Sequence, residues 1–338
     1  MRIAAFCFGS TILCWDTILL ALALLACTLA FWAAYRANGG RAWTALLVVP
    51  LAAVLSFVLA RLLYYGCHPE QFGSLAAALT RFEAGGLCLS GTVLGFTLAA
   101  LLLRPRGGAA LLLDCAAPGL ALGLAIVRLS ALFNGSCRGK AVLSDPRLQR
   151  LPFAVRDAAA DGGTEYRFAA FFLGALLFFA FFLLLLARFA RLYSDRRAPR
   201  GRSGDVFLSF LLLYSAEELL IDSMRNDANY FLFNAFISVA QIFAALTLLV
   251  VLIVYSRRAI RARGLRWLFV WLGWALGLAA VGVCEYLVQR HGNWQLSCYT
   301  LMSAAIALML LCTALMRRAA EKAEAPASAQ SPPPGGPD

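Results

Sequence analysis

Residues 109 to 130 read AALLLDCAAPGLALGLAIVRLS, a run of 22 residues in which only Asp114 and Arg128 are ionisable. A helix needs about 20 predominantly apolar residues to cross a hydrocarbon core of about 30 Å. A helix also satisfies its own backbone hydrogen bonds where no water is available. The run therefore predicts a membrane-spanning helix.

Runs of this kind repeat along the chain, and we expect nine spans at residues 13–35, 43–64, 86–104, 109–130, 166–190, 206–224, 230–256, 267–288 and 296–316. The composition agrees, because 62% of the 338 residues are hydrophobic, only 14% are charged and the mean hydropathy is +0.76. A soluble domain could not bury that much apolar surface. The predicted fold class is all-α, a polytopic transmembrane helical bundle.

The formal net charge of +12 is distributed in a way that predicts topology. Arginines follow the odd-numbered spans, at 36 and 41, 104 and 106, 188 to 202, 257 to 266, and 317 and 318. Cytoplasmic loops carry such an excess of Arg and Lys, so we expect the N-terminus outside and the C-terminus in the cytoplasm. Anionic lipid of the membrane, and not nucleic acid, is the expected partner of these arginines.

This topology places residues 65–85, 131–165, 225–229 and 289–295 outside the cell. The early segment Leu24–Cys27 is similar to a lipoprotein cleavage box, but the apolar run continues past it, so an uncleaved first span is expected. With two histidines and no Cys-x-x-Cys pair, neither a metal site nor a cofactor is expected.

Ionisable residues inside spans are the first candidates for function, because each costs about 2.5 to 3.5 kcal/mol on insertion. They are Arg61, Asp114, Arg128, Glu218, Asp222 and Arg225.

Tyr214, Glu218, Asp222 and Arg225 follow at helical spacing, so a helix places all four on one face, toward the bundle or water. The structural alternative is that Asp222 and Arg225 only neutralise each other. Arg128 lies near the exterior interface, where a guanidinium can hold a phosphate through two parallel hydrogen bonds. Its alternative role is that of a topological anchor.

At these residues the sequence resembles the prolipoprotein diacylglyceryl transferase family, over residues 13–256. The most specific match is the progression Asp114, Pro118, Gly119, Arg128, Asn134, Gly135 and Gly139. Further similar stretches are ARLLYY at 60–65, GGLCLSGTVLG at 85–95 and LLIDSMRND at 219–227. The resemblance implies a seven-span core at residues 1–256, with an additional two-span hairpin at 257–318 and a disordered cytoplasmic tail at 319–338.

The resemblance also implies an activity: the diacylglyceryl group of phosphatidylglycerol moves onto the thiol of a lipobox cysteine in a prolipoprotein, in the bacterial plasma membrane. Arg128 would hold the phosphate. The implied catalytic residues are Arg128, Asp222 and Arg225, and the implied substrate-binding residues are Arg128, Asn134, Gly139, Tyr64, Ser90 and Glu218. No cofactor is implied.

The sequence departs from the family pattern at several of these positions. Ser90 replaces a histidine, Val127 a glycine, Ala131 an asparagine, Ser136 a glutamate, and Glu218 an arginine. A second hypothesis is therefore a catalytically altered relative that binds phospholipid or acts as a membrane scaffold. A third hypothesis, a small-solute transporter, would require internal repeats, and we see none in the sequence.

Overall fold

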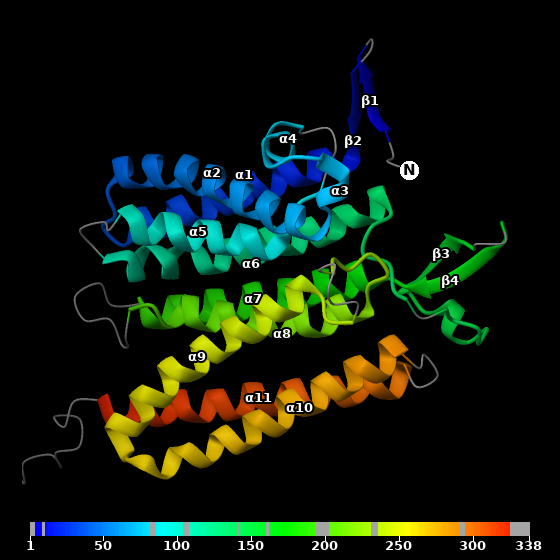
Figure 1. Ribbon diagram of the computed structural model, residues 1–338. Coiled ribbons are helices and arrows are strands. Elements are labelled where there is room, and N and C mark those ends of the chain that lie inside the picture. The colour runs from blue at the N-terminus through cyan, green and yellow to red at the C-terminus, as the bar shows by residue number, and fades with distance from the viewer. Residues whose placement is uncertain are drawn as a thin grey trace, which may run out of the picture.

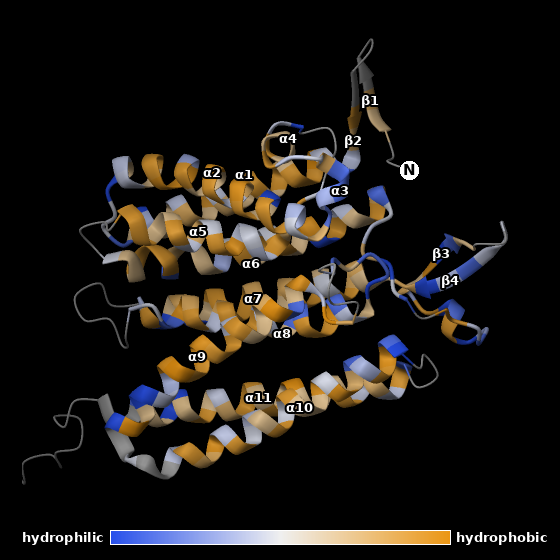
Figure 2. Cartoon of the chain, viewed as in Figure 1, coloured by the Kyte–Doolittle hydropathy of each residue, from blue (hydrophilic) through white to orange (hydrophobic). Residues whose placement is uncertain are grey.

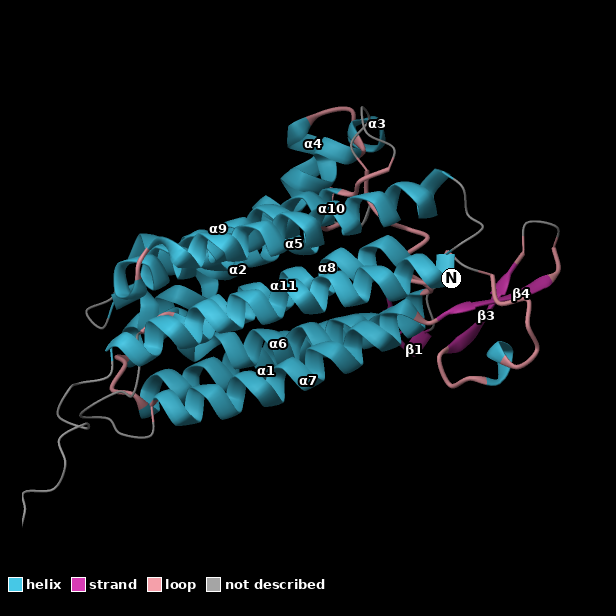
Figure 3. Cartoon of the chain, turned by 90° about the horizontal axis from the view of Figure 1, so that it is seen from below, coloured by secondary structure: helices cyan, strands magenta, loops and turns pink. Residues whose placement is uncertain are grey.

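The computed structural model describes residues 4–8, 11–81, 86–103, 108–140, 142–159, 162–193, 203–230, 236–290 and 295–324. Long helices dominate this part of the chain and lie side by side as a bundle in two views that differ by 90° (Figure 1, Figure 3). They are α1 (Trp15–Ala37), α2 (Ala42–Cys67), α5 (Leu89–Leu103), α6 (Gly108–Asn134), α7 (Ala170–Leu192), α8 (Asp205–Met224), α9 (Val239–Arg263), α10 (Phe269–Arg290) and α11 (Gln295–Glu324).

Among the described residues, seven of these helices are long and apolar enough to cross a membrane, namely α1, α2, α6, α7, α9, α10 and α11. The other two differ for physical reasons. Helix α5 has 15 residues and so is only about 22 Å long. Helix α8 carries four acidic residues, Asp205, Glu217, Glu218 and Asp222. The prediction of an all-α polytopic membrane protein is confirmed.

Two β-hairpins were not predicted, and they move the starts of two spans. Strands β1 (Ala4–Phe8) and β2 (Thr11–Cys14) pair, so the first span begins at Trp15 and not at residue 13. Strands β3 (Ala154–Ala158) and β4 (Thr164–Phe168) pair likewise, so α7 begins at Ala170 and not at residue 166. Each strand is only four or five residues long and pairs with its antiparallel neighbour before the span begins.

The seventh span also begins later than predicted, at Val239 and not at residue 230. Ser238 accepts a hydrogen bond from the Gln241 amide, and the Gln241 side chain accepts one from the Ser238 amide. This capping box fixes the first turn of the helix. The Ser-x-x-Gln signal is in the sequence and would have placed the start correctly.

The connections fall into two groups at opposite ends of the bundle (Figure 1). One end carries the N-terminus, α3 (Pro69–Phe72), α4 (Leu75–Thr80) and the β3–β4 hairpin. The same end includes a short 3-10 helix at Leu148–Arg150, and another, Leu265–Leu268, precedes α10. Hydrophilic residues concentrate at the two ends and apolar residues along the helices (Figure 2).

Several predictions fall on residues outside this description. They concern the predicted tail from residue 325 onward, the basic residues between 194 and 202, Gly85 and His291. The structure does describe the first residues of the predicted tail, and they are helical. Helix α11 continues to Glu324, six residues beyond the predicted end of the hairpin at 318.

Arg61, one of the intramembrane charges, has a structural role. It is 2% exposed, and its guanidinium donates to the carbonyls of Ala78 (2.5 Å), Gly86 (2.8 Å) and Arg81. The same group lies 4.5 Å from the Phe72 ring centroid. Arg61 therefore fastens the segment after α2 back onto that helix, and its charge is satisfied by carbonyl oxygens.

Asp114 is likewise structural, at the other end of the bundle. Its carboxylate accepts hydrogen bonds from the amides of Gly204 (2.6 Å) and Phe207 (2.8 Å) and from the Tyr193 hydroxyl (2.8 Å). These amides belong to the first turn of α8, where an anion is favoured by the helix dipole. Asp114 thus joins α6 to the start of α8.

Helix α8 lies between two hydrophobic cores. One core joins α1, α2, α5 and α6 to α7 and α8, and includes Phe178, Phe207 and Phe210. The other joins α7 and α8 to α9, α10 and α11, and includes Tyr255, Trp274 and Met302. The acidic face of α8 is consequently enclosed by protein, where each charge requires a partner.

Candidate functional site

A cavity of about 440 Å³ lies within the bundle near the end that carries the β3–β4 hairpin. Its apolar wall comes from α1, α2, α5 and α6, with side chains such as Leu20, Ala52 and Phe96. Its charged and larger polar lining residues are Arg128, Asn134, Ser136, Cys137, Glu218, Asp222, Arg225 and Asn229, and the hydroxyl residues Thr28, Ser56, Thr92 and Ser130 also line it. A long apolar wall with polar groups that converge at one end fits a ligand with an apolar body and a polar head.

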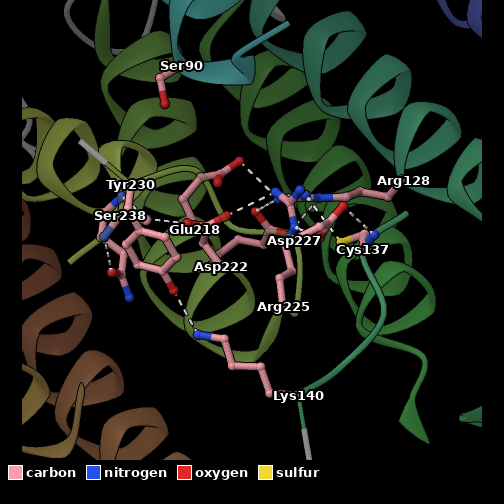
Figure 4. A network of polar contacts seen from close by, with 12 residues as sticks. Ser90, Arg128, Cys137, Lys140, Glu218, Asp222, Arg225, Asp227, Tyr230 and Ser238 are labelled. Carbon is pink, nitrogen blue, oxygen red and sulfur yellow. Dashed lines mark hydrogen bonds and ion pairs between the residues drawn. The ribbon is translucent and has the colours of Figure 1, made fainter. Parts of the chain in front are cut away.

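Arg128 forms the centre of the polar end, where it meets two carboxylates of α8 (Figure 4). Its Nε donates to Glu217 Oε1 (3.1 Å), and its Nη2 donates to Glu217 Oε2 and Glu218 Oε1 (both 2.9 Å). Arg128 is 5% exposed, and both glutamates are 1% exposed. The pairing with Glu217 is bidentate, the strongest geometry for a guanidinium and a carboxylate.

The third helix at this junction approaches through a glycine. A Cβ atom at Gly174 of α7 would lie 2.7 Å from Glu217 Oε1 and 3.3 Å from Arg128 Cδ. Any side chain there would push into the ion pair, so the absence of a Cβ lets α7 close over it. Side chains of α6 and α8 and a glycine of α7 thus pack together around the buried ion pair.

Three members of the predicted stripe lie on α8 and face the bundle, as expected from their spacing, whereas Arg225 lies just beyond the helix as its extended C-cap residue. Tyr214, Glu218 and Asp222 are all buried. The Tyr214 hydroxyl donates to Ser90 Oγ on α5 at 3.4 Å. Ser90 therefore contacts Tyr214, lies apart from Arg128 and Glu218 in Figure 4, and is outside the cavity lining.

Asp222 and Arg225 form a second charged group beside the first. Asp222 Oδ1 accepts from Arg225 Nη1 at 2.9 Å, so the local pair of the structural alternative is present. Asp222 has a further partner, because its Oδ2 accepts from the Ser238 hydroxyl. Arg225 Nε also donates to Asp227 Oδ1 at 3.0 Å. Arg225 is therefore held from two sides by carboxylates.

Cys137 lies between the two arginines. Its Sγ is 3.7 Å from Arg128 Nη1, and its amide donates to Asp227 Oδ2 at 3.0 Å. Its φ of 56° is the left-handed backbone of a tight turn. Burial raises the pKa of the Cys137 thiol, against the opposing effect of Arg128 and Arg225. This shift favours the thiol of Cys137 over the thiolate.

Asp227 provides a prediction about pH. Burial opposes its ionisation, but Arg225 and the Cys137 amide outweigh burial and lower the pKa of Asp227. The lowered pKa stabilises the fold above the unfolded value of about 3.9, and this contribution disappears as pH falls through the folded value. We expect Asp227→Asn to cost about 1 kcal/mol, reduced by the exposure of this side chain.

The measurement is thermal unfolding of both proteins in detergent between pH 3 and 7. The difference between wild type and Asp227→Asn should be constant above about pH 5 and should narrow toward acid pH. A difference that widens as the pH falls would contradict the role of the Asp227 carboxylate.

The structure brings together most of the residues predicted from the sequence. Arg128, Asn134, Glu218, Asp222 and Arg225 all line the cavity. Asn134 accepts from the Ser136 amide at 2.9 Å and so shapes the turn after α6.

Gly139 contributes through its backbone. Its amide donates to the Phe168 carbonyl at 2.7 Å, and it forms an isolated β-bridge with Arg225. A Cβ atom there would lie 2.9 Å from the Phe168 Cβ, which explains the glycine. Gly139 therefore ties the loop after α6 to the end of α8.

Tyr64 lies apart from these residues. Its hydroxyl donates to Gln71 Oε1 at 3.3 Å, its ring stacks on His68, and it is not part of the cavity lining. It packs beside Gly86 in the segment that Arg61 fastens. In this structure its contacts are those of a loop anchor.

Sequence reasoning missed the functional environment of four residues: Glu217, Cys137, Asp227 and Ser238. In the sequence Glu217 is one of two adjacent acids and Cys137 is a cysteine in the segment 131–165, which gives no sign of their partners; the Ser-x-x-Gln capping signal is the one available pointer to Ser238. Within the described residues, no group of three or more His, Cys, Asp or Glu side chains is arranged to hold a metal ion.

The part of the chain that contains this site matches a known protein family. The sequence profile of the prolipoprotein diacylglyceryl transferases matches residues 4–257, about three quarters of the chain and all helices from α1 to nearly the end of α9. The chain belongs to the prolipoprotein diacylglyceryl transferase family. The resemblance inferred from the motifs is thereby confirmed, and α10 and α11 lie beyond the matched region.

Individual relatives are more distant. A phosphatidylglycerol–prolipoprotein diacylglyceryl transferase of Bacillus cereus (strain Q1) is 26% identical over 185 residues, which are 54% of this chain and 65% of the relative. The protein of the same name from Acaryochloris marina (strain MBIC 11017) is 29% identical over 189 residues, which are 55% of this chain and 63% of the relative. The chain therefore spans slightly less than two thirds of the length of these curated relatives.

Proposed function

We propose that this protein is a phosphatidylglycerol–prolipoprotein diacylglyceryl transferase. The observation that carries the proposal is the cavity, whose apolar wall ends in a cluster that contains two guanidinium groups, Arg128 and Arg225. Acyl chains of the lipid would lie along α1, α2, α5 and α6. The phosphate would lie at the polar end, where charge-assisted hydrogen bonds are strong because water is scarce.

In the proposed reaction the thiol sulfur of the acceptor cysteine attacks the glyceryl carbon that bears the phosphate. The carbon–oxygen bond breaks, a thioether forms, and glycerol phosphate leaves with the bonding electron pair. The thiol proton leaves through one of the two carboxylates that line the cavity, Glu218 or Asp222. Arg225 and Arg128 stabilise the charge that develops on the leaving phosphate.

Each arginine retains donors for this purpose. Among the described residues, the only partner of Arg128 Nη1 is the weakly accepting Cys137 sulfur, at 3.7 Å. Within the part of the chain that the structure describes, Arg225 uses Nε and Nη1 for its two carboxylates and keeps Nη2 for a ligand. The carboxylates thus hold each guanidinium in a fixed orientation and keep one edge of it toward the cavity.

The same proposal includes an orientation in the membrane. We place the N-terminus and the β3–β4 end outside the bacterial plasma membrane and the C-terminus in the cytoplasm, because arginines follow the odd-numbered spans. The polar end of the cavity then opens toward the side where an exported prolipoprotein would present its lipobox cysteine.

The second candidate is a catalytically altered relative that binds phospholipid or a membrane partner. Its specific support is the pairing of Arg128 with both Glu217 and Glu218, since two carboxylates neutralise the guanidinium that should receive a phosphate. The family pattern has an arginine in place of Glu218. An ion pair so complete is also what a purely structural arginine would show.

The two candidates are distinguished by incubating a lipobox peptide with the purified protein in phosphatidylglycerol bilayers, followed by mass spectrometry of the peptide. A diacylglyceryl adduct on the cysteine, absent from a peptide with serine in its place, is the result expected of a transferase. Absence of the adduct, while the Bacillus cereus relative is active in the same bilayers, would overturn the proposal and favour the binding protein.

A further inference from the structure

The hairpin of α10 and α11 lies outside the region matched by the family, yet it is packed firmly against the core. Trp271 Nε1 donates to Ser256 Oγ of α9 at 2.9 Å, and Trp274 Nε1 donates to Thr313 Oγ1 of α11 at 3.0 Å. Met302 of α11 is fully buried beside Ser223 of α8. The hairpin is therefore in direct contact with the helix that carries the acidic site residues.

A lysine connects this hairpin to the loop that follows α6. Lys140 Nζ donates to Tyr230 Oη at 2.8 Å and to Gln289 Oε1 of α10 at 2.9 Å (Figure 4 shows the first of these contacts). Gln289 Nε2 in turn donates to Glu285 Oε1 at 2.6 Å, one helical turn earlier. The amide thus accepts from the ammonium and donates to the carboxylate, which fixes its orientation.

The backbone of the same lysine belongs to the site. Its amide donates to the Met224 carbonyl at 2.7 Å, and its carbonyl accepts from Arg167 Nη1 at 3.0 Å. Gly139, the preceding residue, bridges to Arg225, and Cys137 is three residues earlier. Residues 137–140, which we term the clamp segment, therefore connect the two arginines of the site to α10.

The hairpin carries buried polar groups at this point that its own packing does not require. Glu285 is 3% exposed, and among the described residues its Oε2 and the Tyr299 hydroxyl of α11 have no hydrogen-bond partner. A buried carboxylate is costly unless a cation lies near it. Burial lowers the pKa of Lys140. The negative charge of Glu285 opposes that shift, so the carboxylate and the ammonium interact electrostatically.

From these contacts we propose that α10 positions the clamp segment through Gln289 and Glu285, and thereby sets the position of Cys137 and the polar end of the cavity. Gln289 and Glu285 are positioning residues, since neither lines the cavity. The hairpin is on this proposal a part of the site, although it lies beyond the region that the family profile matches. Its proposed effect on the geometry does not depend on the transferase activity; only an effect on the transfer rate would rest on the proposed function.

Cys137 supplies a readout of the clamp segment that needs no activity. It is 3% exposed and reacts with a maleimide only when the segment opens. Cys27 of α1 lines the apolar part of the same cavity and serves as an internal reference. The experiment measures N-ethylmaleimide modification of both cysteines over time, peptide by peptide, in protein reconstituted into phosphatidylglycerol nanodiscs.

Gln289→Leu removes the acceptor for Lys140 at similar volume. We expect it to raise the modification rate of Cys137 about tenfold and to leave Cys27 unchanged, because local opening then loses one charge-assisted hydrogen bond. The double variant E285Q/Q289E exchanges the two side chains. A carboxylate at position 289 still accepts from Lys140 and an amide at position 285 still donates to it, so the wild-type rate should return.

Leu287→Ala, on a more exposed face of the same helix, is the matched control and should change neither rate. An unchanged Cys137 rate in Gln289→Leu would overturn the proposal, as would a parallel rise at Cys27, which indicates general loosening. If Gln289→Leu does not fold, Lys140→Met removes the same hydrogen bond from the loop side and is judged by the same criteria.

Discussion

Replacing Arg128 by alanine is expected to lower the rate of diacylglyceryl transfer by about 1,000-fold, because a preorganised donor to the leaving phosphate is lost from a water-poor site. Arg128 lines the cavity and is held in one orientation by Glu217 and Glu218. The measurement is the initial rate of glycerol phosphate release from phosphatidylglycerol in the presence of a lipobox peptide. A rate within threefold of wild type would contradict the assignment.

The alanine variant needs a control for folding, since it leaves two buried carboxylates without a partner. Breaking a buried ion pair in this way typically costs about 3 to 5 kcal/mol. The triple variant R128M/E217Q/E218Q removes all three charges together and should fold, but it should remain inactive. The double variant E217Q/E218Q keeps Arg128. A difference in transfer rate between the double and the triple variant therefore reports on the guanidinium and not on the stability of the cluster.

A lysine at position 128 separates charge from geometry. Arg128→Lys keeps the positive charge but cannot make the two parallel hydrogen bonds that Arg128 makes with Glu217. We expect its activity to lie between those of wild type and the alanine variant. Full activity would mean that charge alone suffices at this position.

Local sequence signals predicted the helices and the face on which the charged residues lie. Apolar runs located the long helices because a lipid-facing helix must be apolar along its whole length. The spacing of Tyr214, Glu218 and Asp222 placed them on one face because an α-helix repeats every 3.6 residues. Both signals are local, so they could be read from one chain.

The partners of those residues could not be predicted in the same way. Arg128 pairs with Glu217, which is 89 positions away, and nothing in either segment specifies which of two adjacent acids takes the bidentate position. Glu217 and Glu218 differ by about 100° around α8, and only the packing of α6 and α7 lets both reach Arg128. Gly174 completes this packing, but a lone glycine in an apolar run gives no sign of it.

The position of Tyr64 and the contact of Gln289 with Lys140 could not be predicted for the same reason. Tyr64 was expected near the substrate from a resemblance in its motif, but its ring stacks on His68 in a segment that Arg61 folds back. The contact of Gln289 with Lys140 joins residues 149 positions apart, and Gln289 lies beyond the region that the family profile matches. Long-range pairs of this kind depend on the tertiary arrangement, which the sequence pattern alone does not supply.

Asp222→Asn is expected to lower the transfer rate by about 100-fold or more, whether the carboxylate takes the thiol proton or orients Arg225. Asp222 Oδ1 accepts from Arg225, and Oδ2 accepts from Ser238. Asparagine keeps an oxygen that accepts from Arg225 and an amide that can donate to the Ser238 hydroxyl, but it removes the negative charge that orients the guanidinium and the group that would take the proton. The readout is the rate of adduct formation on the lipobox peptide.

Two further variants decide which role Asp222 has. Ser238→Ala removes only the hydroxyl contact and should cost less than tenfold, because the ion pair with Arg225 remains. The exchange D222R/R225D keeps an ion pair of opposite polarity at the same two positions. If Asp222 served only to neutralise Arg225, the exchange would restore activity to near wild type. We expect no restoration, because the exchange moves the cation from the C-cap of α8 into its last turn and takes the carboxylate away from the Ser238 hydroxyl.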